Sequence, residues 1–284
     1  MSIKRVGIVG SGIMGAGIAE TMAVHGLEVV LRSRAQATAD GMVAGMEKSL
    51  ARQVEKGKLA EADRDAALGR VTAVSDLGAL AVCDLVIESV VEDLGVKKHL
   101  FSELDRICPD HTILATNTST LPVVDMAMET GRPDKVCGIH FFNPAPVMSL
   151  VEVVRPITAS DETMAAARAL AEACEKTPVE VKDQAGFIVN ALLFPYLNNA
   201  VRLLENGVAS RDDIDTAMKG GCGFPMGPFS LLDLVGLDTS LAILDALYDE
   251  FRDPNYAAVP LLRRMVAAEL YGRKSGKGFY DYRR

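Results

Sequence analysis

Apolar residues recur with two different spacings along the 284-residue chain. In the first part, short apolar runs alternate with longer segments in which apolar residues recur every three or four positions. This alternation is typical of parallel strand-helix-strand units, because each buried strand must be followed by a helix that returns the chain. Strands are expected over residues 5–9, 28–31, 84–90, 112–115, 135–142, 150–154 and 179–182, with a helix over 161–175.

The spacing of apolar residues changes after Asp183-Gln184-Ala185-Gly186. From Phe187 onward they recur only at helical spacing. The expected helices are 187–205, 211–218, 239–251 and 261–270. The pattern predicts an α/β chain in two domains: a Rossmann-type, doubly wound sheet domain that binds a dinucleotide, over residues 1–183, and an all-helical domain for substrate binding and dimerisation, over 184–284. The many apolar positions of so small a helical domain predict burial against a second copy, hence a homodimer.

Composition narrows the class of protein. With 49% hydrophobic and 24% charged residues, the chain fits a compact globule. The five cysteines are widely spaced and form no CxxC pair, so neither a disulfide framework nor a metal site is expected, and a reducing cytoplasm fits best. No apolar run approaches the roughly 18 residues of a membrane span, and no leader is expected before the first strand. A formal charge of −8 disfavours nucleic acid as a partner.

A glycine-rich turn follows the first expected strand directly and opens an expected helix over 13–25. Its residues, which match the pattern GxGxxG, are Gly10, Ser11, Gly12, Ile13, Met14 and Gly15. In that position glycines permit a tight turn, and backbone N–H groups at the helix N-terminus can approach a pyrophosphate. The sequence therefore predicts a dinucleotide-binding site at this turn, and a purely structural glycine-rich turn is the alternative.

The end of the second expected strand reads Leu31-Arg32-Ser33-Arg34. NAD-binding folds of this type usually carry an Asp or Glu here for the ribose 2′-hydroxyl, and this segment has no acid. Arg32 or Arg34 can pair with a 2′-phosphate, and Ser33 can donate a hydrogen bond to it. The sequence therefore favours NADP(H). The alternative is that the arginines are solvent-facing charges and that NAD(H) binds without the carboxylate.

One of the four histidines stands apart from the others. His140 lies within an apolar strand, and the turn Asn143-Pro144-Ala145-Pro146 separates it from the strand that carries Glu152. If the second strand returns beside the first, Glu152 meets the imidazole. A carboxylate on one ring nitrogen fixes the tautomer and leaves the other nitrogen to exchange a proton with a substrate oxygen, as hydride transfer requires. A buried structural pair is the alternative.

Several segments along the chain together resemble the 3-hydroxyacyl-CoA dehydrogenase family, and most closely its stand-alone 3-hydroxybutyryl-CoA dehydrogenases. They are residues 6–15 (VGIVGSGIMG), 86–93 (VIESVVED), 116–119 (TNTS), 138–144 (GIHFFNP), 183–190 (DQAGFIVN), 225–228 (PMGP), 236–238 (GLD) and 274–280 (KSGKGFY). The resemblance implies an enzyme that interconverts 3-ketoacyl-CoA and (S)-3-hydroxyacyl-CoA, such as acetoacetyl-CoA and 3-hydroxybutyryl-CoA, with a nicotinamide cofactor. Ser33 departs from this family, which usually has an acid at that position.

The same resemblance implies roles for particular residues. His140 would be the acid/base that Glu152 orients, and Ser119 and Asn190 would hold the reacting oxygen. The residues implied to touch the cofactor are Glu92, Lys97, Asn117, Ser119 and Asn143, and those implied to touch the acyl-CoA are Ser49, Lys56, Ser119 and Asn190. The cluster of Lys48, Arg52, Lys56 and Lys58, otherwise a solvated helix face, becomes a partner for CoA phosphates.

Two other functions stay open at this point. The β-hydroxyacid dehydrogenases of the GxIMG type have a similar first turn and basic residues after the second strand, but they rely on a catalytic lysine where this chain has Gly186 to Asn190. A non-catalytic dinucleotide-binding protein is the second alternative. Such a protein would have no reason to keep Ser119, His140, Glu152 and Asn190 together.

Overall fold

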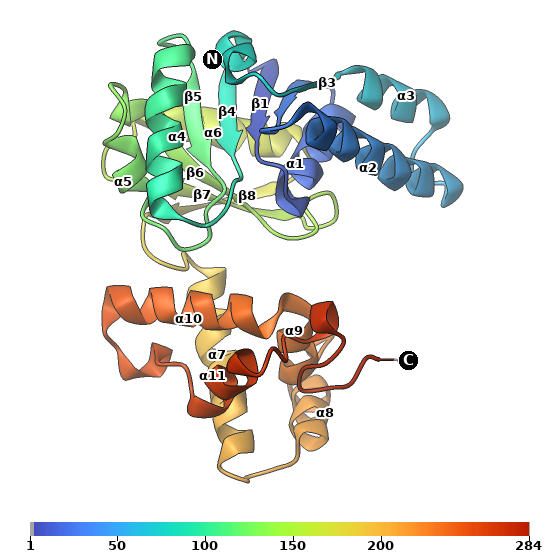
Figure 1. Cartoon of the computed structure of the whole chain (residues 1–284), viewed down its shortest axis with the longest axis vertical. Coiled ribbons are helices and arrows are strands. Elements are labelled where there is room, and N and C mark those ends of the chain that lie inside the picture. Colours follow the sequence, from blue (N-terminus) through green and yellow to red (C-terminus); the bar gives the residue numbers. More distant parts are fainter. Residues whose placement is uncertain (1–2, 284) are drawn as a thin grey trace. The chain divides into compact units, whose positions relative to one another are not determined.

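The computed structural model describes residues 3–283. The chain forms two compact units, Met1–Gln184 and Ala185–Arg284. The first is built around a sheet and the second from helices alone, apart from isolated bridges that join Gly272, Lys277 and Asp281 near the C-terminus (Figure 1). The expected fold class, a Rossmann-type sheet domain followed by an all-helical domain, is confirmed. No helix among residues 3–283 is both long and apolar enough to span a membrane.

The first unit contains an eight-stranded sheet in the order β3-β2-β1-β4-β5-β6-β7-β8. The strands are β1 (Arg5–Val9), β2 (Glu28–Arg32), β3 (Val71–Val74), β4 (Leu85–Glu88), β5 (Ile113–Thr116), β6 (Val136–Phe141), β7 (Leu150–Arg155) and β8 (Thr177–Lys182). All neighbours are parallel except β6 and β7, which are antiparallel. The strand order reverses between β1 and β4, and open parallel sheets bind ligands at the carboxyl ends of the strands beside such a switch point.

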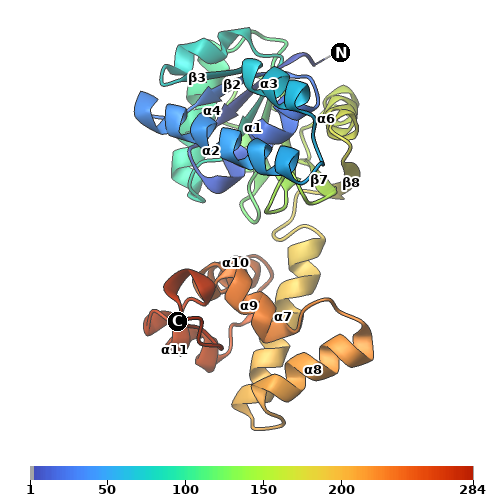
Figure 2. The same ribbon diagram turned by 90° about the vertical axis from the view of Figure 1, so that its right-hand side faces the viewer.

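Helices cover both faces of the sheet (Figure 1). They are α1 (Ile13–Val24), α2 (Gln36–Glu55), α3 (Glu61–Gly69), α4 (Leu94–Ile107), α5 (Val123–Ala127) and α6 (Asp161–Ala173), with 3-10 turns η1 (Leu77–Val82) and η2 (Pro133–Lys135). Apolar side chains of α1, α2 and α6, including Ile18, Met46 and Leu170, form one core with the strands. Figure 2 shows α1, α2 and α3 side by side. These buried strands give the continuous apolar runs that were read from the sequence.

One strand of the sheet was not predicted. Strand β3 is an edge strand, and none of its four residues is fully buried: three are half-buried and Thr72 is exposed. Because an edge strand packs on fewer neighbours, its sequence carries little of the apolar continuity that marks the central strands. The predicted strands themselves are all present, with ends that differ by a few residues.

The second unit packs its other helices around α7 (Val189–Glu205). The remaining helices are α8 (Arg211–Cys222), α9 (Pro228–Val235), α10 (Leu237–Phe251) and α11 (Pro260–Ala267), followed by the 3-10 turn η4 (Arg273–Ser275). Phe194, Phe229 and Leu244 lie at its core. Helix α9 was not predicted, because its sequence follows a Pro- and Gly-rich run that reads as a loop. Pro228 is nevertheless compatible with the first helical position, where its missing N–H has no partner to lose.

A buried carboxylate ties the start of α9 to the C-terminal segment. Asp215, 3% exposed, accepts hydrogen bonds from Phe229 N (2.8 Å), Ser230 N (3.1 Å) and Ser230 Oγ (2.7 Å), and from the Tyr280 hydroxyl (2.9 Å). Asp215→Asn turns one acceptor oxygen into a donor that faces other donors, so we expect a loss of about 2 kcal/mol in the free energy of unfolding. Urea unfolding measures it, with the exposed Asp212→Asn as control. An unchanged midpoint for Asp215→Asn would contradict this assignment.

Candidate active site

Two polar residues expected to act together, Ser119 and His140, lie at the carboxyl ends of strands of the first unit. The turn at Gly10 follows β1, Ser119 follows β5, and His140 lies near the end of β6. Parallel strands place these ends on one edge of the sheet. The first unit therefore gathers the glycine turn and the polar side chains at a single edge, beside the switch point.

The glycine turn is shaped by close backbone contacts. Gly10 has φ +141°, and a Cβ there would lie 2.1 Å from the carbonyl oxygen of Ser89. A Cβ on Gly15 would lie 2.6 Å from the carbonyl oxygen of Gly10. Gly12 is the N-cap of α1 and offers no side-chain acceptor, so the first-turn N–H groups have no capping side chain. An anion is the natural partner for such a helix N-terminus. These residues therefore fit a dinucleotide pyrophosphate.

The three residues after the second strand differ in accessibility. Ser33 is only 3% exposed, and its backbone N donates to Val74 O (3.1 Å). Arg32 is half-buried, and its Nε donates to Ser75 O (3.2 Å). Arg34 is exposed. Among the three residues expected to contact a 2′-phosphate, Arg34 is therefore the most accessible cation. The main consequence of Ser33 is that no carboxylate stands at this position.

His140 and Glu152 form the expected pair. They are register partners in the antiparallel strands β6 and β7, and Nδ1 of His140 lies 2.7 Å from Oε2 of Glu152. Both residues are buried, at 4% and 0% exposure. The other ring nitrogen, Nε2, lies 3.2 Å from Oγ of Ser119. An ionised Glu152 requires a proton on Nδ1, so Nε2 is the nitrogen that can exchange a proton on the Ser119 side.

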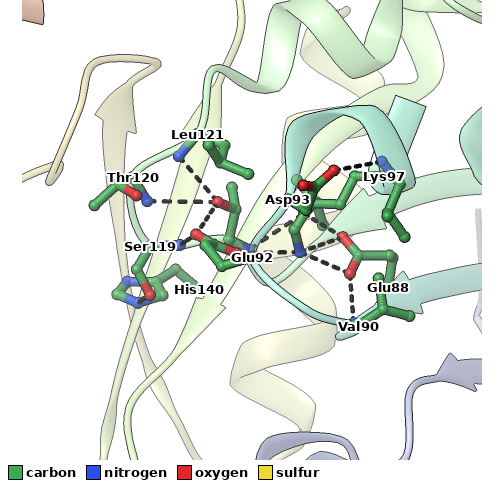
Figure 3. Close-up of polar contacts among 12 residues, drawn as sticks. Glu88, Val90, Glu92, Asp93, Lys97, Ser119, Thr120, Leu121 and His140 are labelled. Carbon is green, nitrogen blue, oxygen red and sulfur yellow. Dashed lines mark hydrogen bonds and ion pairs between the residues drawn. The ribbon is translucent and has the colours of Figure 1, made fainter. Parts of the chain in front are cut away.

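The side chain of Glu92 holds the loop that carries Ser119 (Figure 3). Oε1 of Glu92 accepts hydrogen bonds from the backbone N of Ser119 (2.9 Å) and from Oγ1 of Thr118 (2.5 Å). The side-chain oxygen of Asn117 accepts from the backbone N of Phe141 (2.8 Å), next to His140. Asn117 thus holds the ends of β5 and β6 together, a role the sequence did not suggest.

Lys97, expected at the cofactor, is 1% exposed and lies between carboxylates. Its Nζ donates to both oxygens of Glu88, at 2.7 and 2.9 Å, and lies 3.2 Å from Oε2 of Glu92. Glu88 is a site residue that the sequence interpretation missed. A buried acid at the end of an apolar strand was the available signal, because such a charge requires a cation nearby.

Two of the residues expected to touch acyl-CoA, Ser49 and Lys56, lie on and beside α2. Ser49 lines a cavity of about 300 Å³ together with Glu20 and Asn143, and its Oγ donates to Oε1 of Glu20 (3.0 Å). Burial raises the pKa of Glu20, and the hydrogen bonds from Ser49 and Gln53 partly offset this. Lys56 follows α2 and is exposed. The peptide bond between Asn143 and Pro144 is cis.

Asn190 belongs to the second unit, where it occupies the first turn of α7 and is 8% exposed.

Burial raises the pKa of the Cys83, Cys137 and Cys174 thiols to about 12, so these are not thiolate nucleophiles near neutral pH. Among residues 3–283, no group of three or more His, Cys, Asp or Glu side chains is placed to hold a metal ion.

Comparison with known proteins identifies the family. Residues 5–184 match the family described as 3-hydroxyacyl-CoA dehydrogenase, NAD binding domain, and residues 186–282 match its C-terminal domain. The chain belongs to the 3-hydroxyacyl-CoA dehydrogenase family. The resemblance that the sequence motifs carried is therefore confirmed, and it covers both units.

Individual members of the 3-hydroxyacyl-CoA dehydrogenase family are similar over their full length. The 3-hydroxybutyryl-CoA dehydrogenase of Clostridioides difficile is 46% identical over 278 residues, 98% of this chain and 99% of that protein. The crystal structure of FadB2 from Mycobacterium tuberculosis superimposes with a TM-score of 0.97 at 46% identity and covers 100% of both chains. That of (S)-3-hydroxybutyryl-CoA dehydrogenase PaaH1 from Ralstonia eutropha has the same TM-score at 44% identity, again over 100% of both.

Proposed function

We propose that this protein interconverts acetoacetyl-CoA and (S)-3-hydroxybutyryl-CoA by hydride transfer with a nicotinamide cofactor. The observation that carries the proposal is the hydrogen-bonded series Ser119, His140 and Glu152 at the carboxyl edge of the sheet, on the same edge as the glycine turn. The similar proteins named 3-hydroxybutyryl-CoA dehydrogenase support the choice of substrate. Family membership favours this function over a β-hydroxyacid dehydrogenase or a non-catalytic binding protein.

The proton chemistry follows from the geometry of the series. A nicotinamide cofactor, when bound, would provide the hydride for C3 of the ketone or take it up in the reverse direction. As C3 is reduced, its oxygen gains negative charge and must gain a proton, which Nε2 of His140 donates. Glu152 stabilises the imidazolium through Nδ1. Ser119 donates a hydrogen bond to the same oxygen, an interaction that strengthens as charge develops. We propose that Asn190 of the second unit also holds this oxygen.

The proposed cofactor contacts begin at the glycine turn. The N–H groups of the first turn of α1 would hold the pyrophosphate. The other proposed cofactor contacts are Glu92, Lys97, Asn117, Ser119 and Asn143, and of these Ser119 is proposed to lie at the nicotinamide. The proposed acyl-CoA contacts are Ser49, beside the cavity next to α2, and the exposed Lys56, which suits a phosphate.

The preferred cofactor is proposed to be NADP(H). No acid stands after β2 to repel a 2′-phosphate, and Arg34 is exposed there. Arg34→Ala should lower kcat/KM for NADPH by about 10-fold or more and leave that for NADH within about 2-fold, because only NADPH carries the phosphate that the guanidinium can pair with. Initial rates over a range of each cofactor measure this, with the exposed Arg168→Ala on α6 as control. Equal losses with both cofactors would contradict the assignment.

The assembly and location of the protein are also proposed. The second unit exposes large apolar side chains, among them Leu192 at 72% and Val208 at 66%, which supports a homodimer formed through that unit. The five cysteines are free, which supports a reducing cytoplasm. Light scattering at micromolar concentration tests the dimer, and a monomeric mass would refute it.

Oxidation of three alcohols tests the proposed substrate. With NADP⁺, the protein should oxidise (S)-3-hydroxybutyryl-CoA and show little or no rate with the (R)-thioester or with free 3-hydroxybutyrate. The thioester is required if the CoA arm supplies binding energy for catalysis. Faster oxidation of the free acid would instead indicate a β-hydroxyacid dehydrogenase.

A further inference from the structure

A series of hydrogen-bonded charges runs from the interior of the sheet to Ser119 (Figure 3). It begins at Glu88, the last residue of β4, which is 0% exposed. Its carboxylate accepts hydrogen bonds from Nζ of Lys97 (2.7 and 2.9 Å), Oγ1 of Thr116 (2.7 Å) and the backbone N of Val90 (2.6 Å). With donors from three directions, this carboxylate is held in one position.

Lys97 is the second member of the series. Its ammonium is shared between Glu88 and Glu92 and is shielded from solvent. A buried ammonium is costly unless carboxylates and hydrogen bonds compensate it, so its position depends on both partners. Glu88, which binds it through two oxygens at shorter distances, is the partner that fixes it.

Glu92 is the third member, and its two oxygens have separate contacts. Oε2 faces Lys97, whereas Oε1 accepts from Ser119 N and Thr118 Oγ1. The side chain of Glu92 is 41% exposed, so its own surroundings do not confine it. The contact with Lys97 holds one oxygen and thereby directs the other at the loop of Ser119.

We propose that Glu88 is a positioning residue for the proposed reaction: through Lys97 and Glu92 it fixes Ser119 at its 3.2 Å contact with His140. If Glu88 loses its charge, Lys97 is drawn onto Glu92, its remaining carboxylate, and Glu92 is drawn away from the N–H of Ser119. The hydroxyl of Ser119 then loses its alignment with the reacting oxygen. The inference rests on the proposed function, because it concerns the same oxygen and the same serine.

A double-mutant cycle tests the proposal. Glu88→Gln keeps the shape of the side chain, and we expect it to lower kcat for acetoacetyl-CoA reduction at saturating NADPH by about 10-fold, because misalignment acts on the chemical step. In a Ser119→Ala background the same substitution should cost less than about 2-fold, since the group it positions is gone. Equal losses in both backgrounds, or wild-type kcat for Glu88→Gln, would overturn the proposal.

Two further variants separate positioning from general damage to the fold. Asp105→Asn breaks the Asp105–Arg132 ion pair elsewhere in the same unit, and should lower the melting temperature without changing kcat. Glu92→Gln interrupts the series one step nearer to Ser119 at a more exposed position, and its effect on kcat at saturating NADPH should show the same non-additivity with Ser119→Ala. If Glu88→Gln does not fold, this second cycle decides, and additive losses in it overturn the proposal.

A measurement without turnover keeps the proposal distinct from the proposed function. The amide N–H of Ser119 donates to Oε1 of Glu92. Its NMR chemical shift should therefore move upfield in Glu88→Gln and stay unchanged in Asp105→Asn. An unmoved Ser119 amide overturns the positioning role whatever the substrate is. Absence of acetoacetyl-CoA reduction by the wild-type protein, with a shifted amide, overturns only the proposed function.

Discussion

His140→Gln is expected to lower kcat for acetoacetyl-CoA reduction by about 100-fold or more. Glutamine fills much of the same space and can still contact Glu152, but it cannot donate a proton to the substrate oxygen near neutral pH. Loss of general acid–base catalysis costs about 10²- to 10⁴-fold. In the series Ser119, His140 and Glu152, it is Nε2 of His140 that faces the serine. Initial rates at saturating cofactor measure the effect.

The control for this prediction is His99→Gln. His99 lies on α4 of the same unit, its side chain is 78% exposed, and its Nε2 lies 3.7 Å from Oε2 of Glu103. We expect wild-type kcat from this variant. If His140→Gln also retained kcat within a few-fold of wild type, the proton would come from another group and the proposed mechanism would be wrong.

Glu152→Gln is expected to lower kcat by about 100-fold while leaving the fold intact. The amide of glutamine can accept from Nδ1–H, but it carries no charge to stabilise the imidazolium that forms when the alcohol is oxidised, and it can also stabilise the wrong tautomer by donating to Nδ1. The pair is buried, so the lost charge is not replaced by solvent. Steady-state rates in the direction of oxidation measure this effect most directly.

Glu180→Gln is the matched control for Glu152→Gln. Glu180 lies on the neighbouring strand β8, where its carboxylate pairs with Arg155 near the surface. Removing its charge should change neither kcat nor the KM values. A loss in kcat for Glu152→Gln no larger than that for Glu180→Gln would show that the carboxylate beside His140 is structural, which is the alternative left open by the sequence.

The contact between His140 and Glu152 could be predicted because its determinants are local. Two apolar runs on either side of an Asn-Pro turn predict adjacent strands, and in such a pair side chains in register lie on the same face. The structure has this arrangement, with His140 opposite Glu152. The glycine turn was predictable for a similar reason, since its pattern stands directly between a strand and a helix.

The series from Glu88 to Ser119 could not be predicted from spacing alone. It joins residues from the end of β4, the start of α4 and the loop after β5, and no local pattern says which of these side chains meet. The identity of the acids and the lysine was visible, but their mutual distances depend on how β4 and β5 align. The near-complete burial of Ser33 was also invisible, because exposure after a strand depends on the neighbouring strand β3, which the apolar pattern did not reveal.

The initial rate of acetoacetyl-CoA reduction by the wild-type protein, followed by cofactor absorbance with NADPH and with NADH, tests the central claim most directly. Each cofactor is tested at several concentrations. We predict saturable turnover with both and a markedly higher kcat/KM with NADPH. Turnover mainly with NADH would retain the dehydrogenase and remove the role assigned to Arg34. No turnover with either cofactor would contradict the proposed function.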